Sequence, residues 1–296
     1  QPPATAPPMA VALVDPCEPS AVVQRLTELQ RDEYDGRAMQ VVAILTTHRH
    51  WDHAGGNRRL KKLYPSVRVY GGKEDGVAGC THPLIDLDTL PVGGLTVTVL
   101  HAPCHTRGSL CYRIDGPTPS LFGGDTLFCG GCGAPFEGTV DEMGRNFVKI
   151  WKRCPPNTLV FTGHEYTSAI LPSYLSGSQP LPNHPAAFGK AASLLWRAQQ
   201  MRSQATPTPT TPLILADELL INVNFAPLRV ACETLTTAYR QYRALAAHHA
   251  RLAQQGQMQT TDLDQGAAIL GCTSASAADF GCVSAADGDE LSIVMR

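Results

Sequence analysis

The chain has 296 residues, a formal net charge of −2 and a pI of about 6.6. Its 24 Lys and Arg residues nearly balance its 26 Asp and Glu residues, which argues against a nucleic-acid partner and favours a small-molecule ligand. A chain of this length has room for one large core and a smaller second unit.

The start of the chain and its cysteines indicate a compartment. The segment 1–10 is rich in Pro and Ala and has neither a basic leader nor an uninterrupted apolar run. No window approaches the roughly 20 apolar residues of a membrane span. The ten cysteines are scattered, and a chain this long needs no disulfide staples. We therefore expect a soluble, monomeric protein with reduced thiols in the cytosol, with the mitochondrion as the alternative.

Strands and helices alternate along the first 170 or so residues. Buried strands are predicted at 10–14, 41–45 and 67–70, helices at 18–29 and 57–63, and a hairpin-like strand at 95–100. Further strands at 109–114, 120–122 and 158–161 each end at a polar or Gly-rich loop that carries a His or an Asp. The alternation predicts a layered α/β core, in which ligands bind at the strand ends.

The composition changes at about residue 172, where strand candidates disappear. Helices are expected at 186–202 and 231–251, with a Thr/Pro-rich linker at 205–212. Beyond residue 255 the chain is rich in Ala, Ser, Gly and Asp, which is typical of disorder. We predict an α/β domain at 1–172, a helical domain at 173–255 and a disordered tail at 256–296.

The strongest motif follows the strand at 41–45. Four potential metal ligands stand there within six residues: His48, His50, Asp52 and His53. Imidazole and carboxylate ligands suit Zn, Fe or Mn, and the absence of clustered thiolates argues against a closed structural zinc site. A histidine pair alone is more often part of a polar surface loop, whereas H-x-H-x-D-H after an apolar strand favours a metal site.

Three more candidate ligands follow later strands. His105, Asp125 and His164 each lie beside Gly or another small residue, which allows the backbone to approach a metal closely. Taken singly, each is more often a capping or hydrogen-bonded residue. Together with the first motif they complete a set of seven.

The remaining His, Cys and Trp residues near these motifs have simpler interpretations. Cys129 and Cys132 form a C-x-x-C without a second pair, so we expect them to pack a loop. Trp51 is expected to pack under the metal-binding loop. Surface or turn positions are expected for the other histidines considered: His82, His101, His248 and His249.

The order of the motifs resembles that of the glyoxalase II (hydroxyacylglutathione hydrolase) family of the metallo-β-lactamase superfamily. T-H-x-H-x-D-H-x-G-G-N lies at 47–57, A-P-C-H-T at 102–106, G-D-T-L-F at 124–128 and G-H-E-Y-T at 163–167. The resemblance implies an αββα sandwich, an α/β fold, with a helical C-terminal domain. It also implies that 1–172 is the catalytic domain and 173–255 a substrate-binding domain. Family members have two strands ahead of the segment matching 11–16, so we expect these first strands to be missing here and one sheet edge to be open.

The resemblance also implies a site with two divalent metal ions, Zn or else Fe or Mn. His48, His50 and His105 would hold one ion, Asp52, His53 and His164 the other, and Asp125 would bridge them. Metal binding lowers the pKa of water to about 7, so a shared hydroxide could attack a thioester carbonyl. The candidate catalytic residues are Asp52 and Asp125, which would orient the nucleophile, with Asp52 steering its proton.

The family's substrate contacts are matched only in part. Where the family has a basic residue and a tyrosine, in G-C-G-K-F-Y-E-G, this chain has Ala134 and Phe136. Tyr166 is similar to a further family contact, and Arg240 and Arg243 are the candidate equivalents of a basic pair. Losing a cation removes charge-assisted hydrogen bonds of about 1.5 to 3 kcal/mol each, so free glutathione thioesters should bind less well.

The expected substrate is an S-2-hydroxyacyl thioester of glutathione or trypanothione, such as S-D-lactoylglutathione. Trypanothione has amidated glycine carboxylates and would not need the lost cations, and the trypanosomatid branch of the family is similar at 105–108 and 133–134. Two other functions stay open: a sulfur dioxygenase with a single iron, and a weakly active relative with a binding or regulatory role. The helical extension argues against the first, and the complete ligand set against the second.

Overall fold

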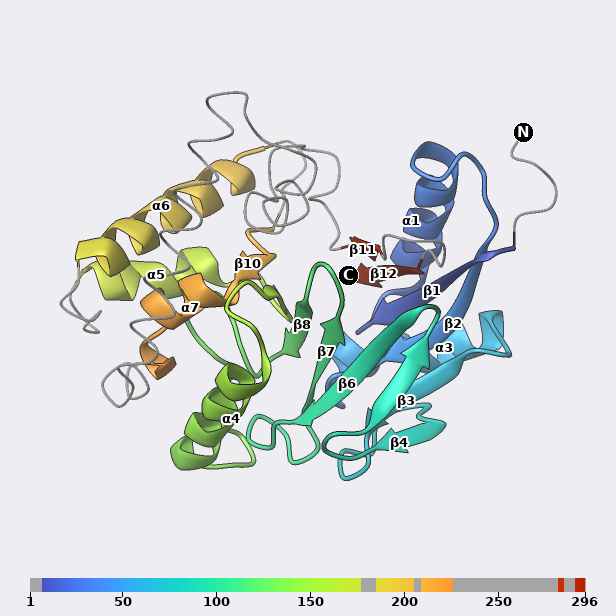
Figure 1. The fold of residues 1–296 in the computed structure, drawn as a ribbon, viewed down its shortest axis with the longest axis horizontal. Coiled ribbons are helices and arrows are strands. Elements are labelled where there is room, and N and C mark those ends of the chain that lie inside the picture. The colour runs from blue at the N-terminus through green and yellow to red at the C-terminus, as the bar shows by residue number, and fades with distance from the viewer. Residues whose placement is uncertain (1–6, 177–184, 205–208, 226–281, 285–290, 296) are drawn as a thin grey trace.

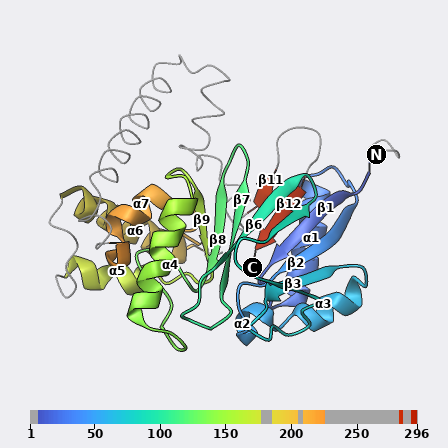
Figure 2. The ribbon, with the colours of Figure 1, turned by 60° about the horizontal axis from the view of Figure 1, so that its bottom comes forward.

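The computed structural model describes residues 7–176, 185–204, 209–225, 282–284 and 291–295 (Figure 1). Two six-stranded sheets face each other, with helices on their outer faces (Figures 1 and 2). The first sheet contains, in spatial order, β11 (Cys282–Ser284), β12 (Leu291–Met295), β1 (Met9–Val14), β2 (Met39–Leu45), β3 (Arg68–Gly72) and β4 (His82–Leu84). The second contains β10 (Leu213–Ile214), β9 (Leu159–Thr162), β8 (Ser120–Gly124), β7 (Leu110–Asp115), β6 (Leu95–His101) and β5 (Thr89–Val92).

Helices cover both sheets, so the predicted αββα sandwich is confirmed. They are α1 (Pro19–Asp32), α2 (Trp51–Ala54), α3 (Asn57–Leu63), α4 (Val140–Arg153), α5 (Thr167–Leu175), α6 (Pro185–Arg202), α7 (Leu215–Ile221) and the 3-10 turn η1 (Val223–Phe225). Apolar residues of α1 and α3 pack on the first sheet, and those of α4 and α7 pack on the second. Helices α5, α6 and α7 share a smaller apolar cluster of their own.

The main core lies between the two sheets, and β1 shows how the sequence forms it. Ala12 and Val14 point into the space between the sheets, whereas Val11 and Leu13 pack under α1. Successive side chains of a strand point to opposite faces, and here both faces are buried. This explains why the strand is an unbroken apolar run, as expected for a covered parallel sheet.

Strand directions bring the polar loops to one edge of the sandwich. In the first sheet, β1 runs parallel to β2. In the second, β8 runs parallel to β9, and β6 has the same direction because both β6 and β8 are antiparallel to β7. The loops that follow these strands therefore collect at the carboxyl ends, as the sequence analysis expected for a ligand site.

Several elements of the structure were not among the predicted ones, and α4 and β10 are the clearest examples. Helix α4 was not predicted, although Thr139 and Glu142 form a capping box at its start. Strand β10 lies in the region predicted to lack strands and pairs antiparallel with β9, so that prediction is wrong at this point. The reason is that two apolar residues, Leu213 and Ile214, extend an existing sheet and need no strand pattern of their own. The division into units at residue 172 stays a prediction.

The edge of the first sheet beyond β1 is covered, contrary to the expectation of an open edge. Strand β12 pairs in parallel with β1, and β11 pairs antiparallel with β12. The prediction of a disordered tail at 256–296 is therefore wrong for these two strands, because pairing with β1 satisfies their backbone groups. The rest of that segment lies outside the described residues. So do the predicted helix at 231–251, His248 and His249.

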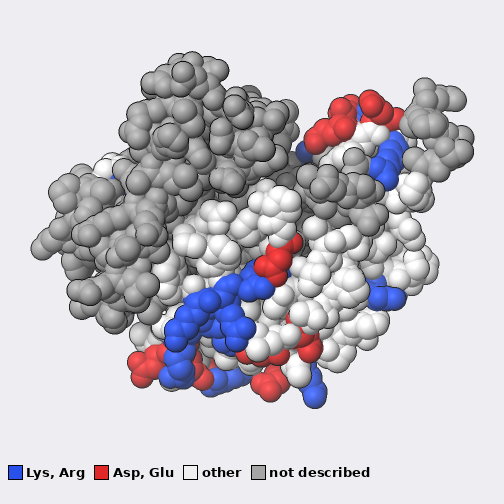
Figure 3. Space-filling model, viewed as in Figure 1, with Lys and Arg blue, Asp and Glu red and all other residues white. Residues whose placement is uncertain are grey.

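Charged side chains lie on the outer surface of α4, where Figure 3 shows Lys and Arg gathered with Asp and Glu beside them. The opposite face of α4 buries Met143, Phe147 and Ile150 against the second sheet, so the helix is amphipathic. Over the part of the chain that the structure describes, no helix combines the length and the apolar character that crossing a membrane requires.

Candidate metal centre

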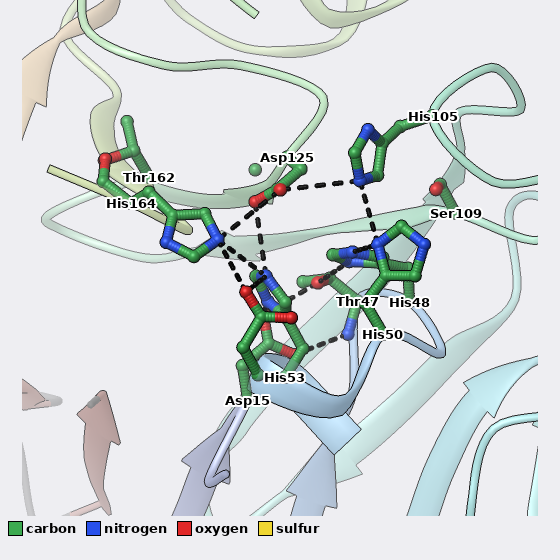
Figure 4. Close-up of polar contacts among 12 residues, drawn as sticks. Asp15, Thr47, His48, His50, His53, His105, Ser109, Asp125, Thr162 and His164 are labelled. Carbon is green, nitrogen blue, oxygen red and sulfur yellow. Dashed lines mark hydrogen bonds and ion pairs between the residues drawn. The ribbon is translucent and has the colours of Figure 1, made fainter. Parts of the chain in front are cut away.

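The seven predicted ligands meet at the carboxyl ends of four strands, and all except Asp52 are labelled in Figure 4. The segment after β2 carries His48, His50, Asp52 and His53, the last two on α2. His105 follows β6, Asp125 follows β8 directly and His164 follows β9. The ligands thus come from both sheets, which is possible because the loops share one edge of the sandwich.

One group consists of His48, His50 and His105, each of which offers a ring nitrogen within 4.8 Å of the others. The Nε2 atom of His48 lies 2.9 Å from Nδ1 of His50, and Nε2 of His105 lies 3.1 Å from that same atom. Nδ1 of His50 carries either one proton or one lone pair, so it cannot form hydrogen bonds with both neighbouring nitrogens at once. Such convergence suits a shared cation.

A second group consists of Asp52, His53 and His164, which also meet the 4.8 Å limit. Nε2 of His164 lies 3.2 Å from Nε2 of His53 and 3.2 Å from Oδ2 of Asp52. A carboxylate and two imidazoles are again a donor set that suits Zn, Fe or Mn.

Asp125 lies between the two groups, with His105 on one side and His164 on the other (Figure 4). Its carboxylate oxygens lie 3.3 Å from Nε2 of His53, 3.4 Å from Nε2 of His105 and 3.5 Å from Nε2 of His164. Its Oδ1 atom is buried and accepts no well-aligned hydrogen bond. A buried carboxylate oxygen without such a bond fits a position beside a metal ion.

Burial and charge tune these side chains. Burial lowers the pKa values of His48 and His105, which keeps both imidazoles neutral and able to bind a cation. Burial alone would lower the pKa of His53, but the carboxylates of Asp15 and Asp125 raise it to about 10. Burial alone would raise the pKa of Asp125, but the adjacent imidazoles, His53 first, hold it below its usual value.

Two glycines permit the close approach of backbone to this cluster. A Cβ atom on Gly163 would come within 2.4 Å of Oδ1 of Asp125, and one on Gly133 within 2.8 Å of Nδ1 of His105. Any larger residue would therefore displace a predicted ligand. Gly163 is one of the small residues beside a ligand in the sequence, whereas Gly133 is not adjacent to any ligand along the chain.

Asp15 is a functional residue that the sequence analysis missed. It follows β1, is buried, and accepts hydrogen bonds from the backbone N–H and the hydroxyl of Thr47 at 2.7 Å each. Its Oδ2 atom also lies 2.8 Å from Nδ1 of His53, so it orients that ring with Nε2 toward the metal centre. The available signal was an Asp-Pro pair directly after a buried strand, a pattern that by itself indicates only a turn.

A second missed residue is Asp75, whose carboxylate is fully buried. It accepts hydrogen bonds from the backbone N–H groups of Arg49 and Gly108 at 2.5 and 3.1 Å. Arg49 lies between His48 and His50, and Gly108 lies three residues after His105. Arg49 in turn forms an ion pair with Glu137. Nothing in the spacing of these residues along the chain marks them as partners.

The predicted substrate residues lie at the rim of the centre. The Phe136 ring is 70% exposed, and its centroid lies 5.0 Å from that of His105. Ala134 is exposed, and its carbonyl accepts a hydrogen bond from Nδ1 of His105 at 2.8 Å. Tyr166 stacks on His164 with centroids 5.0 Å apart. The other two residues predicted to bind substrate, Arg240 and Arg243, lie outside the described residues.

The expectation for Trp51 is wrong. Its side chain is 80% exposed and does not pack under the metal-binding loop. The inward positions of the short helix α2 are taken by His53 and Ala54, both buried, so the first residue of the helix points outward.

His82 is exposed on β4, in keeping with the predicted surface position, whereas His101 is half-buried at the end of β6. Neither belongs to a group of possible ligands found among the described residues. The ring of His101 contacts the carbonyl of Arg107 at 2.9 Å instead. Cys129 is a buried thiol in the cluster of α5, α6 and α7, and Cys132 is a half-buried thiol that packs against the core next to α4. Both are free, in keeping with the expected packing role.

Comparison with known proteins identifies the family of this fold and site. Residues 26–164 match the family model described as the metallo-beta-lactamase superfamily. The chain is 38% identical over 215 residues to a protein of Arabidopsis thaliana named "Hydroxyacylglutathione hydrolase cytoplasmic", an alignment covering 71% of this chain and 77% of the relative. It is 42% identical over 159 residues to a probable hydroxyacylglutathione hydrolase of Schizosaccharomyces pombe, covering 53% of this chain and 60% of that relative.

Among solved structures, a metallo-beta-lactamase from Staphylococcus aureus is 20% identical and aligns over 78% of this chain and 57% of its own, with a TM-score of 0.47. The identity with the Arabidopsis protein extends over more than two thirds of both chains. The chain belongs to the hydroxyacylglutathione hydrolase, or glyoxalase II, family of the metallo-β-lactamase superfamily.

Proposed function

We propose that the chain hydrolyses S-2-hydroxyacyl thioesters of glutathione or trypanothione, such as S-D-lactoylglutathione, to a hydroxy acid and a free thiol. The observation that carries this proposal is the position of Asp125 between two facing groups of His and Asp side chains. The names of the relatives support the reaction, since both contain hydroxyacylglutathione hydrolase. The word "cytoplasmic" in the Arabidopsis name supports a cytosolic site of action.

Two divalent ions, zinc or alternatively iron or manganese, are the cofactors of this proposal. The first group would hold one ion, the second would hold the other, and Asp125 would contact both. When bound, such ions lower the pKa of water to about 7 and polarise a carbonyl group. The donor set fits this function because it is made of imidazoles and carboxylates and leaves Oδ1 of Asp125 without a well-aligned hydrogen bond.

The protein's own residues orient the reactants. Asp52, whose side chain is 25% exposed, can accept a proton from the attacking water and remain in contact with solvent. Asp125 is nearly buried and holds its charge, because the surrounding imidazoles lower its pKa. The leaving thiolate of a thioester is stable, so no strong general acid is required.

The substrate would lie over the exposed rings at the rim. Phe136 and Tyr166 flank the centre on the His105 side and the His164 side, respectively. Neither ring carries a cation, and Ala134 supplies none. A thiol carrier without a free glycine carboxylate, as in trypanothione, therefore fits the described part of the rim better than glutathione does.

The experiment that tests the proposal combines metal analysis with turnover. We expect two ions per chain at saturating zinc, measurable hydrolysis of S-D-lactoylglutathione, and a loss of more than about a hundredfold in kcat for Asp125→Ala. Asp115→Ala, at an exposed carboxylate paired with Arg113, is the matched control and should keep full activity. Full activity in Asp125→Ala would rule out the binuclear mechanism. One iron per chain without thioester hydrolysis would instead favour a sulfur dioxygenase.

A further inference from the structure

Glu218 of α7 is a fully buried carboxyl group outside the metal centre. Its Oε2 atom accepts hydrogen bonds from the backbone N–H of Gly130 at 2.9 Å and from Nδ2 of Asn222 at 3.1 Å. Its Oε1 atom is buried and accepts no well-aligned hydrogen bond, although the thiol of Cys129 faces this carboxyl. Burial raises the pKa of this carboxyl to about 7. Burying a carboxyl group destabilises the folded state, whereas an apolar residue at this position would not. The hydrogen bond to Gly130 should therefore have a role that outweighs this destabilisation.

Asn222, one helical turn after Glu218, contacts the same turn of the chain. Its Nδ2 atom donates to the carbonyl of Gly131 at 2.9 Å and lies 3.4 Å from that of Phe128. The turn closes on itself through hydrogen bonds between the backbones of Phe128 and Gly131. Gly130 has a φ of +74°, a conformation that needs glycine. Glu218 of α7 and Asn222, the C-cap residue of that helix, thus hold a turn that has no regular sheet partner within the described residues.

The segment that leaves this turn supports both groups of the metal centre. The N–H of Gly133 donates a hydrogen bond to the backbone carbonyl of Asp125 at 2.7 Å, and the carbonyl of Ala134 accepts a hydrogen bond from Nδ1 of His105. At the start of the turn, the Phe128 ring lies 6.0 Å from the ring of His164. A shift of the turn would therefore alter the orientation of ligands on both sides of the site.

We propose that Glu218 and Asn222 are positioning residues, which set the geometry of the metal centre by anchoring the turn at 128–131 to α7. The inference rests on the proposed metal centre and assigns to α7 a task besides packing. Hydrogen bonds that orient metal ligands typically change metal affinity by about 10- to 100-fold. Glu218 and Asn222 do not contact a predicted ligand directly but act through the turn at 128–131. The effect should therefore appear in metal binding itself, before any effect on substrate.

The test measures zinc affinity by competition with a chromophoric chelator at pH 7.5, using the full chain and its Glu218→Ala, Glu218→Gln and Asn222→Ala variants. We expect zinc binding to weaken about tenfold in Glu218→Ala and Asn222→Ala. Glu218→Gln should stay within about twofold of wild type, because its amide oxygen can still accept the hydrogen bond from Gly130. Cobalt-loaded protein should show a changed visible spectrum in the two alanine variants only.

Asp217→Asn is the matched control. Asp217 precedes Glu218 on α7 and forms an ion pair with Lys190 of α6 at 2.7 Å. Removing its charge breaks this ion pair between α6 and α7 but removes no hydrogen bond to the turn at 128–131. Its zinc affinity should equal that of wild type. Equal weakening in Asp217→Asn, or wild-type affinity in a folded Glu218→Ala, would overturn the inference. If Glu218→Ala does not fold, Asn222→Ala decides by the same criterion.

The same measurements separate this inference from the proposed activity. A wild-type chain that binds zinc but hydrolyses no thioester would refute the activity, and the affinities of the variants would still decide the role of Glu218. A wild-type chain that binds no zinc would refute both.

Discussion

Phe136 and Ala134 occupy the rim of the metal centre at positions where the glyoxalase II family has a tyrosine and a cation. Both side chains are exposed, so either position can carry a longer residue without displacing a buried group. The backbone of Ala134 has a separate task, because its carbonyl orients His105. A substitution at residue 134 therefore alters the rim and leaves that hydrogen bond in place.

We predict the effect of restoring the family's cation and tyrosine at the rim with the double substitution Ala134→Lys and Phe136→Tyr. The KM for S-D-lactoylglutathione should fall about tenfold or more, because each charge-assisted hydrogen bond contributes about 1.5 to 3 kcal/mol. The kcat should change little, since that end of the substrate is bound equally in the ground and transition states. Steady-state kinetics on the glutathione and trypanothione thioesters measures both constants.

Wild-type protein should saturate more readily with the trypanothione thioester. Ala134→Gln, which lengthens the side chain without adding charge, controls for size and should give a much smaller fall in KM. A wild-type chain that saturates easily with the glutathione thioester and gains nothing from the lysine would show that this interpretation of the rim is wrong.

Among the helices and strands, α7 carries a group whose ionisation opposes folding. Burial raises the pKa of Glu218 from 4.5 to about 7. The folded state therefore holds this proton more tightly than the unfolded state does. The stabilisation is present in full below about pH 4.5 and is lost as the pH rises through about 7. The thiol of Cys129, which faces the same carboxyl, stays neutral because burial raises its pKa well above the ordinary value.

We predict that Glu218→Gln removes this pH dependence. Relative to wild type, the variant should gain stability between pH 5 and pH 8, by an amount on the order of 2 to 3 kcal/mol for a shift of this size. Urea unfolding of both proteins at several pH values gives the difference in the free energy of unfolding. The contributions of all other titratable groups cancel in this difference because the two proteins share them. Parallel pH profiles for the two proteins would contradict a raised pKa at this position.

Helix α4 shows how far an element can be predicted from local sequence. The pattern Thr139-x-x-Glu142 is a capping box, and the structure has both of its hydrogen bonds. Buried Met143, Phe147 and Ile150 follow at helical spacing. Both signals were available in the sequence, so this helix could have been predicted. Strand β10 could not, because its two residues form a strand only by pairing with β9.

Across the whole molecule, the metal centre joins the two sheets. The ligands after β2 belong to the first sheet, whereas His105, Asp125 and His164 follow strands of the second. Metal bound there would link these loops in addition to the apolar core, the hydrogen bonds and the Arg49–Glu137 ion pair that already connect them. Its binding free energy would add to the stability of the folded chain.

We therefore predict that chelation lowers the midpoint of thermal unfolding. Zinc at about a thousand times its dissociation constant stabilises a protein by about 4 kcal/mol, which for a chain of this size corresponds to a Tm change on the order of 10 °C. Calorimetry of zinc-loaded protein with and without EDTA measures it. Asp125→Ala is the control and should respond much less to EDTA, because it lacks the shared ligand. An unchanged Tm in wild type would argue against a metal that bridges the sheets.

The sequence by itself predicted the layered core, the metallo-β-lactamase sandwich and the seven side chains of the candidate metal centre. Strands such as β1 and β2 are apolar on both faces, which restricts them to a covered sheet. The ligands could be found because they stand in short motifs directly after strands, so local spacing carries the signal. Their convergence then follows from strand direction, since parallel strands end at one edge.

Only the tertiary structure decided which distant residues support that centre. Asp15 meets His53, Asp75 meets Gly108, and Glu218 of α7 meets Gly130. Each pair is separated by more than 30 residues, and a lone acidic residue in a sequence is far more often solvated than buried. The pairing of β12 with β1 is of the same kind. Hydrogen-bond partners and buried charges depend on the packing of whole layers, and local sequence does not record that packing.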